Sequence, residues 1–343
     1  MAAITHLASN CWYAVAPSAT LTDQPLPLPF AGHDFVLFRD CDGIPKAFSD
    51  RCPHRGASLA LGRVEAGCLR CPFHGWAFDA SGHCLEVPAD GPGASLPARS
   101  HLQQARVVHE HRGFIWLWWG EGEADPALLP DLPQFDPAQW QQVRSSFPWQ
   151  AHFSRVIESN LDNSHAYWVH KSSFASQESP LSIPYDLEKG ERWFSAKVTF
   201  DLPLPPVLKL LRRLQGKGAK LSATTKFSFF YPNLNIVDTT VSDILHVVFV
   251  NASLPQSETE TLCRWVKYSP RKSMNLPGRE AKSVEISRTI FEEDHGVVKS
   301  QRPYAVPLDF ADESHVNSDL LSIEYRKLLK RLSSISAPVT IAS

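Results

Sequence analysis

The stretches CPHRG at residues 52–56 and CPFHGW at residues 71–76 decide the fold of the first part of this chain. Each stretch supplies one thiolate and one imidazole, in the spacing C-x-H, sixteen residues, C-x₂-H. In a [2Fe–2S] cluster, two cysteines can hold one iron while two histidines hold the other. The pattern therefore predicts such a cluster, with four candidate ligands: Cys52, His54, Cys71 and His74.

A structural zinc site is the alternative for the same four side chains. Zinc fingers usually pair their cysteines in one knuckle and their histidines in another, whereas each loop here is mixed. A zinc-stabilised binding module would have neither colour nor O₂ consumption, so a visible spectrum separates the two hypotheses. The other cysteines lie on or beside apolar strands, which favours buried free thiols: Cys11, Cys41, Cys68, Cys84 and Cys263.

Composition indicates an ordinary globular protein. Of 343 residues, 43% are hydrophobic and 20% charged, and the net charge of −2 gives no reason to expect nucleic acid or a membrane surface as a partner. No apolar run approaches the roughly 20 residues that span a bilayer. We find no signal peptide at the N-terminus, and seven cysteines are an odd number for a disulfide framework. We therefore expect a cytoplasmic protein.

The order of strand and helix patterns predicts an α+β protein. Short strands and turns fill residues 1–120, and an acidic, proline-rich linker is predicted at 121–150. Residues 151–343 should form the larger domain, with a helix over 153–170, antiparallel strands over 191–268 and later helices. A basic insertion at 205–220 is best interpreted as a solvated helix face, with a lid or a docking surface for a reductase as alternatives.

A second possible metal site begins in the helix predicted over 153–170. Asp162, His165 and His170 follow the pattern D-x₂-H-x₄-H. An Fe(II) that activates O₂ uses two histidines and one carboxylate and leaves positions open for O₂ and substrate. Close pairs also arise by chance among fourteen histidines, so the preceding cysteine–histidine loops strengthen this interpretation.

Helix geometry limits how these side chains can share one metal ion. His165 and His170 would lie roughly 140° apart around a regular helix, so they converge only if the helix bulges or ends between them. Asp162 is placed to accept a hydrogen bond from the second nitrogen of His165. The carboxylate ligand should then come from elsewhere. Asp294 is the best candidate, with Glu292 and Glu293 as competitors.

These motifs together resemble the Rieske oxygenase α subunits, in particular the short group that contains vanillate and dicamba O-demethylases, caffeine-type N-demethylases and chlorophyllide-related oxygenases. The similarity covers nearly the whole chain. The segments that carry it are NCWYAVAP (10–17), DRCPHRGASLALGRV (50–64), CPFHGWAFDASGHCLEVPA (71–89), the run from Asp162 to His170, FEEDHGVVKSQ (291–301) and SIEYRKLL (322–329).

The resemblance implies a Rieske domain followed by a helix-grip-like antiparallel sheet with helices, and a head-to-tail homotrimer. Cys52, His54, Cys71 and His74 would hold the [2Fe–2S] cluster, and His165, His170 and Asp294 the mononuclear iron. Asp162 would bridge its own His165 and His74 of a neighbouring subunit, carrying electrons between the centres. One departure concerns an asparagine that many relatives carry three residues before this aspartate, where the chain has Ser159 and then Asn160.

The implied function is that of a terminal oxygenase that monooxygenates a small aromatic or hydrophobic substrate, by hydroxylation or by oxidative O- or N-demethylation. No G-x-G-x-x-G fingerprint is present, so NAD(P)H would act through a separate flavin- or ferredoxin-type reductase. Alternatives are a ring-hydroxylating dioxygenase, a chlorophyllide-related oxygenase and a pure Rieske electron carrier. Six strand residues could line the pocket, although core packing is the commoner role for aromatic residues: Phe227, Phe229, Asn235, His246, Phe249 and Asn251.

Overall fold

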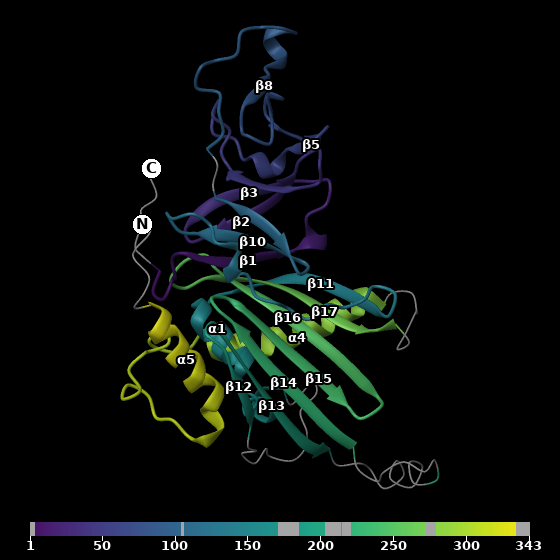
Figure 1. Ribbon diagram of the computed structural model, residues 1–343, viewed down its shortest axis with the longest axis vertical. Coiled ribbons are helices and arrows are strands. Elements are labelled where there is room, and N and C mark those ends of the chain that lie inside the picture. Colours follow the sequence, from purple (N-terminus) through teal and green to yellow (C-terminus); the bar gives the residue numbers. More distant parts are fainter. Residues whose placement is uncertain are drawn as a thin grey trace. The chain divides into compact units, whose positions relative to one another are not determined.

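The computed structural model describes residues 4–103, 106–170, 185–202, 214, 221–271 and 279–333, and Figure 1 shows its elements. The described chain divides into two compact units. The first runs to Gln134 and includes Leu254–Glu258, and the second contains Phe135–Ser253 and the residues from Thr259 onward.

The first unit is built from three small antiparallel sheets, ordered β1-β10-β9, β2-β3-β4 and β5-β6-β7-β8. Its strands are β1 Cys11–Pro17, β2 Leu26–Phe30, β3 His33–Arg39, β4 Pro45–Ser49, β5 Arg63–Glu65, β6 Cys68–Arg70, β7 Ala77–Phe78, β8 Cys84–Glu86, β9 Val108–His111 and β10 Phe114–Trp119. Short 3₁₀ helices are η1 Ser18–Thr20, η2 Leu59–Leu61, η3 Pro88–Asp90 and η4 Pro126–Leu128.

Buried apolar residues hold the two cysteine–histidine loops in place in this unit. All six residues of β10 (FIWLWW) are buried, as are all seven of β1, with which β10 pairs. A separate apolar cluster contains Cys52 and Cys71 together with Phe38, Phe48 and Trp76. The two loops are therefore held by the hydrophobic core at their cysteine ends.

The second unit contains a seven-stranded antiparallel sheet in the order β11-β17-β16-β15-β14-β13-β12. Its strands are β11 Trp140–Trp149, β12 Asp186–Lys189, β13 Trp193–Leu202, β14 Leu221–Phe230, β15 Leu234–Val241, β16 Leu245–Pro255 and β17 Thr261–Pro270. Its helices are α1 Phe153–Leu161, α2 Ala166–Val169, α4 Arg279–Val298, η6 Asn317–Asp319 and α5 Leu320–Ser333.

The helices cover one face of this sheet (Figure 1). Helix α1 contacts β14 and β15, α4 contacts β11, and α5 contacts β13, while α1 also lies against α4 and α5. A shared apolar cluster joins Val156 of α1 and Phe291 of α4 to Cys263 and Trp265 of β17. This helix-covered face is the inner face of the sheet, and it places α1 and α4 side by side.

The expected α+β fold, an all-β unit followed by an antiparallel sheet with helices, is confirmed. Two local details differ from the sequence-based expectation. Part of the segment expected to be a linker, residues 140–149, forms the edge strand β11. The helix expected over 153–170 ends at Leu161 and resumes only as α2. The basic insertion at 205–220 lies outside the described residues, apart from Leu214. None of the described helices is long and apolar enough to cross a membrane.

Two arginines and two glutamates tie α1 to α5 through a closed ionic network. Arg155 bonds Glu158 at 3.2 Å and Glu313 at 2.7 Å, and Arg326 bonds the same two carboxylates at 2.7 and 2.6 Å. Both arginine side chains are only 3% exposed. Burial raises the pKa of Glu313, but the two guanidinium groups outweigh it and hold that pKa below its ordinary value. The network fixes the helix on which the second histidine site begins.

We expect Glu158→Gln to lower the free energy of unfolding by about 3 kcal/mol, because it leaves two buried guanidinium groups without one of their carboxylates. Urea unfolding followed by circular dichroism measures the change. Glu292→Gln is the matched control, since Glu292 pairs with Arg288 in an exposed i,i+4 ion pair worth less than about 0.5 kcal/mol. Equal stability of the two variants would contradict a supporting role for the network.

Candidate metal centres

The two loops of the first unit each close in a tight turn at their cysteine. The amide of Gly56 donates to the Cys52 carbonyl at 2.9 Å, and the amide of Gly75 donates to the Cys71 carbonyl at 3.1 Å. Both glycines have φ above +70°, a conformation that residues with a side chain rarely adopt. The loops therefore depend on these glycines for their shape.

The four predicted ligands are brought together as a sulfur pair and an imidazole pair. The thiols of Cys52 and Cys71 interact with each other, and burial first and this neighbour second raise the pKa of Cys52 to about 11. The rings of His54 and His74 lie 4.5 Å apart between centroids. This grouping fits a cluster in which cysteines hold one iron and histidines the other.

The imidazole of His54 has a buried ring nitrogen that is suited to binding a metal ion. Its ring stacks on Trp76, with 4.6 Å between centroids and 5° between planes. Its Nδ1 atom is buried and has no hydrogen-bond partner among the described residues. A buried ring nitrogen without a partner is costly unless it binds a metal or water. The residues present thus fit a Rieske-type cluster.

The second centre forms where the chain breaks its helix. Helix α1 ends at Leu161, and Asp162 has an extended backbone with ψ of 134°. Its carboxylate accepts hydrogen bonds from the amide and hydroxyl of Ser164 at 2.8 and 2.7 Å, and from the amide of His165 at 3.1 Å. These contacts stabilise a turn that places His165 and His170 at the two ends of the four-residue helix α2.

Three ligand atoms converge at this point. The Nε2 atoms of His165 and His170 lie 3.2 Å apart, and Asp294 Oδ1 lies 3.4 and 3.2 Å from them. Two neighbouring ligands of one metal ion, each about 2.1 Å from it, are separated by roughly 3 Å. Among the described residues this trio is a group that could hold a metal ion. The expected interruption between the two histidines is present, because α2 ends at Val169, immediately before His170.

The electrostatics of the trio favour positive charge. Burial lowers the pKa of His165, but the carboxylates of Asp162 and Asp294 outweigh it and raise that pKa to about 9. The pKa of His170 is also raised by Asp294 and Glu293 against the effect of burial. Burial raises the pKa of Asp294, and the two imidazoles bring it below its ordinary value. The site therefore stabilises a proton or a divalent cation at the same place.

Both histidines are oriented by a second carboxylate. His165 Nδ1 lies 3.1 Å from Asp162 Oδ2, as expected, and His170 Nδ1 lies 2.9 Å from Glu293 Oε2. The sequence suggests Glu293 only as a competitor of Asp294 for the metal, whereas the structure places it behind His170. Its exposed neighbour Glu292 pairs with Arg288 instead. The run EED at residues 292–294 already indicates that its three carboxylates have different roles, because consecutive residues of a helix point about 100° apart.

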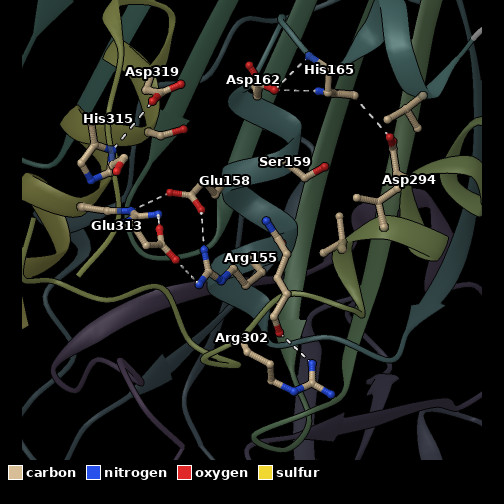
Figure 2. A pocket seen from close by; sticks show the side chains of 17 residues that line it. Arg155, Glu158, Ser159, Asp162, His165, Asp294, Arg302, Glu313, His315 and Asp319 are labelled. Atoms are coloured by element: carbon tan, nitrogen blue, oxygen red, sulfur yellow. Dashed lines mark hydrogen bonds and ion pairs between the residues drawn. The ribbon is translucent and has the colours of Figure 1, made fainter. Parts of the chain in front are cut away.

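A cavity of about 420 Å³ opens beside the trio, within the second unit. Figure 2 shows Asp162, His165 and Asp294 along one side, with the ionic network of Arg155 and Glu158 on the other. The cavity is lined mainly by polar side chains, which suits a polar contact better than an apolar substrate.

The inner face of the sheet holds five of the six residues considered for a substrate pocket. Strand alternation and register place Phe227, Phe229, Asn235, Phe249 and Asn251 on the side of Cys263, toward the helices. His246 has the opposite parity, bonds Asp238 at 2.9 Å and contacts Trp140 edge-on. It therefore lies on the outer face and cannot line a pocket under α1 and α4.

Comparisons with known proteins find a match for each of the two units. Residues 11–104 match the Rieske [2Fe-2S] domain, and residues 149–334 match the vanillate O-demethylase oxygenase C-terminal domain. The 4beta-methylsterol monooxygenase of Methylococcus capsulatus is 32% identical over 274 residues, which are 76% of this chain and 68% of that protein. A putative toluene-4-sulfonate monooxygenase iron-sulfur subunit of Comamonas testosteroni is 32% identical over 179 residues, 52% of this chain. The chain spans about half the length of that subunit.

Solved structures share the fold. The structure of Pseudomonas putida CBB5 NdmA with caffeine superposes with a TM-score of 0.71 at 24% identity, covering 95% of this chain and 91% of that one. Dicamba monooxygenase bound to 3,6-dichlorosalicylic acid gives a TM-score of 0.71 at 22% identity, covering 97% and 99%. The architecture of the two units is therefore that of these proteins.

We expect Glu293→Ala to weaken divalent-metal binding by 10- to 100-fold, because losing the partner of His170 Nδ1 frees that ring to rotate. Titration of the metal-free second site with Co²⁺, followed by its visible absorption, measures the dissociation constant. Glu292→Ala changes the adjacent exposed carboxylate and should leave the affinity unchanged. Equal weakening in both variants would mean that general negative charge, and not the hydrogen bond to His170, supports the metal.

Proposed function

We infer that this chain is the terminal component of a multicomponent monooxygenase. The reason is that it belongs to the oxygenases that join a Rieske [2Fe–2S] domain to a vanillate O-demethylase-type C-terminal domain. It uses O₂, and electrons from a separate flavin- or ferredoxin-type reductase, to hydroxylate or oxidatively demethylate a small aromatic or hydrophobic substrate. The observation that carries this proposal is the convergence of two imidazoles and one carboxylate on a single point.

The proposed ligand sets follow the geometry of the two centres. Cys52, His54, Cys71 and His74 would hold the cluster, and His165, His170 and Asp294 the mononuclear iron. When bound, the cluster supplies one-electron transfer and the iron supplies O₂ activation. The chain's own groups orient these ligands: Asp162 and Glu293 each accept a hydrogen bond from the Nδ1–H of one histidine and so present its Nε2 to the metal.

Asp162 has a second proposed role as the route for electrons. Its side chain is 25% exposed and borders the cavity, so it can touch His165 and still accept a contact from outside. We propose that this contact is His74 of a neighbouring subunit in a head-to-tail homotrimer. The polar lining of the cavity supports a docking role for that side of the site. A cytoplasmic location is proposed as well, and seven free cysteines are consistent with it.

We expect about three irons and two sulfides per chain after anaerobic purification, because one cluster and one mononuclear site bind them. Metal and sulfide analysis measures the stoichiometry, and EPR of the dithionite-reduced protein should give the low average g value of a histidine-ligated cluster. O₂ uptake and formaldehyde release against a panel of aryl methyl ethers and N-methyl compounds then test the reaction. Stoichiometric zinc without sulfide would overturn the proposal.

Asp162→Asn should keep both metal centres, because the amide oxygen can still accept a hydrogen bond from His165, but reductase-driven O₂ uptake should fall by about 10- to 100-fold because the variant removes the carboxylate charge between the centres. Metal analysis and stopped-flow reoxidation of the reduced cluster separate the two effects. Ser159→Ala, one helical turn earlier on α1, is the control. A variant that retains iron and also reoxidises its cluster at the wild-type rate would remove Asp162 from the electron path.

A further inference from the structure

A buried carboxamide on the inner face of the sheet has no bonding partner. Asn235, the second residue of β15, is fully buried. Neither its Oδ1 nor its Nδ2 makes a hydrogen bond within the described part of the chain. A buried amide left without partners destabilises a fold, and such groups usually meet water or a ligand. The group is therefore a candidate contact for a molecule that enters from outside.

Register places this amide beneath the two helices that carry the metal-site carboxylates. Asn235 pairs directly with Asn251 of β16, which is 2% exposed. The Oδ1 of Asn251 lies 3.9 Å from the sulfur of Cys263, which packs with Val156 of α1 and Phe291 of α4. Val156 precedes Asp162 by six residues, and Phe291 precedes Asp294 by three. The amide pair thus lies on the sheet face that α1 and α4 cover, next to an apolar cluster to which both helices contribute.

Aromatic side chains surround the amide pair on the same face. Phe229 is directly opposite Asn235 across the β14–β15 ladder, and Phe227 and Phe249 are both opposite Val237, two residues further along β15. Directly opposed side chains of an antiparallel pair lie about 5 Å apart at Cβ. Flat apolar walls beside a polar amide suit a planar ring with one polar edge.

Charge on this face favours a neutral substrate. Lys267 of β17 is the half-buried cation of the described inner face, and its ammonium group donates to Ser283 Oγ at 3.1 Å. Ser283 precedes Asp294 by eleven residues on α4, which is about 16 Å along the helix axis. A small ring cannot reach both this cation and the metal trio. A carboxylate buried at the amide pair would therefore lack a counter-charge, which is costly.

We propose that Asn235, with Asn251 beside it, is the specificity-determining contact for a neutral aromatic substrate that bears a carboxamide-like edge, an N–H next to a C=O. An amide side chain offers both a donor and an acceptor, so this edge satisfies both at once. The inference rests on the proposed oxygenase function and adds the substrate class to it.

The first test compares two buried asparagines of the metal-loaded enzyme by thermal unfolding. Asn235→Leu removes an amide that bonds nothing in the chain, so its Tm should equal or exceed that of the wild type. Asn233→Leu is the matched control, because fully buried Asn233 donates to the Ser253 carbonyl at 3.3 Å. Its Tm should fall by roughly 2–4 °C. Asn235→Ala, which cannot overcrowd the site, separates lost bonding from crowding.

The second test measures binding of three matched probes to the same preparations by isothermal titration calorimetry. 4-Methoxybenzamide carries the amide edge, 4-methoxytoluene lacks a polar edge, and 4-methoxybenzoate is an anion. The benzamide should bind the wild type most tightly. Asn235→Leu and Asn235→Ala should each weaken benzamide binding by at least about tenfold. Asn235→Ala, which cannot crowd the site, should not weaken binding of the toluene, because that probe makes no hydrogen bond to the amide.

Three results would overturn the inference. One is a loss of Tm, or of folding, in both Asn235 variants that matches Asn233→Leu. Another is wild-type enzyme that binds the benzamide no better than the other two probes. The third is benzamide binding that is unchanged by the Asn235 variants. A preparation with three irons and two sulfides that gives any of these results overturns the substrate class alone, whereas zinc without sulfide removes the proposed function.

Discussion

The turn at Asp162 is the constraint on which the second centre depends. A continuous helix would point His165 and His170 in different directions, whereas this chain leaves helical geometry after Leu161 and again at His170, so that the two histidines flank the short helix α2. The carboxylate of Asp162 stabilises this departure through Ser164 and the backbone of His165, and it also bonds the His165 ring. One side chain therefore ends a helix, fixes a turn and orients a candidate metal ligand. Its side chain is also 25% exposed and borders the cavity.

Helix α4 supplies two further carboxylates to the second centre, Glu293 and Asp294. Asp294 faces both imidazoles, while Glu293 reaches the far nitrogen of His170, so two adjacent carboxylates serve one site in different ways. This division requires α4 to lie beside α1 at a fixed rotation. The apolar contacts of Val156 and Phe291 with β17 fix that rotation from the sheet, and the ionic network of Arg155 and Arg326 fixes α1 from α5. The metal trio is thus a product of packing on both sides of α1.

Two buried asparagines near the start of β15 differ in their hydrogen bonding. Asn233 is bonded to the strand beside it, whereas Asn235 is equally buried and bonded to nothing in the described chain. Both are buried asparagines only two residues apart, so the residue type cannot distinguish them. The difference lies in whether a backbone carbonyl happens to be within reach. A folded chain tolerates an unpaired amide at a cost to stability, and active sites are where such costs are common.

The sequence by itself determined the cysteine–histidine loops, the α+β order of elements and the short list of second-site residues. Each loop holds its two ligands within four residues, so local turns position them and spacing alone identifies them. The break of the helix at Asp162 comes from local contacts with Ser164 and His165. Only the folded chain shows that Glu293 stands behind His170 and that His246 lies on the outer face. Those outcomes depend on contacts between residues more than 100 positions apart or on strand register, and no local pattern encodes either. Helix packing and sheet register, which are set by the whole core, supply that information.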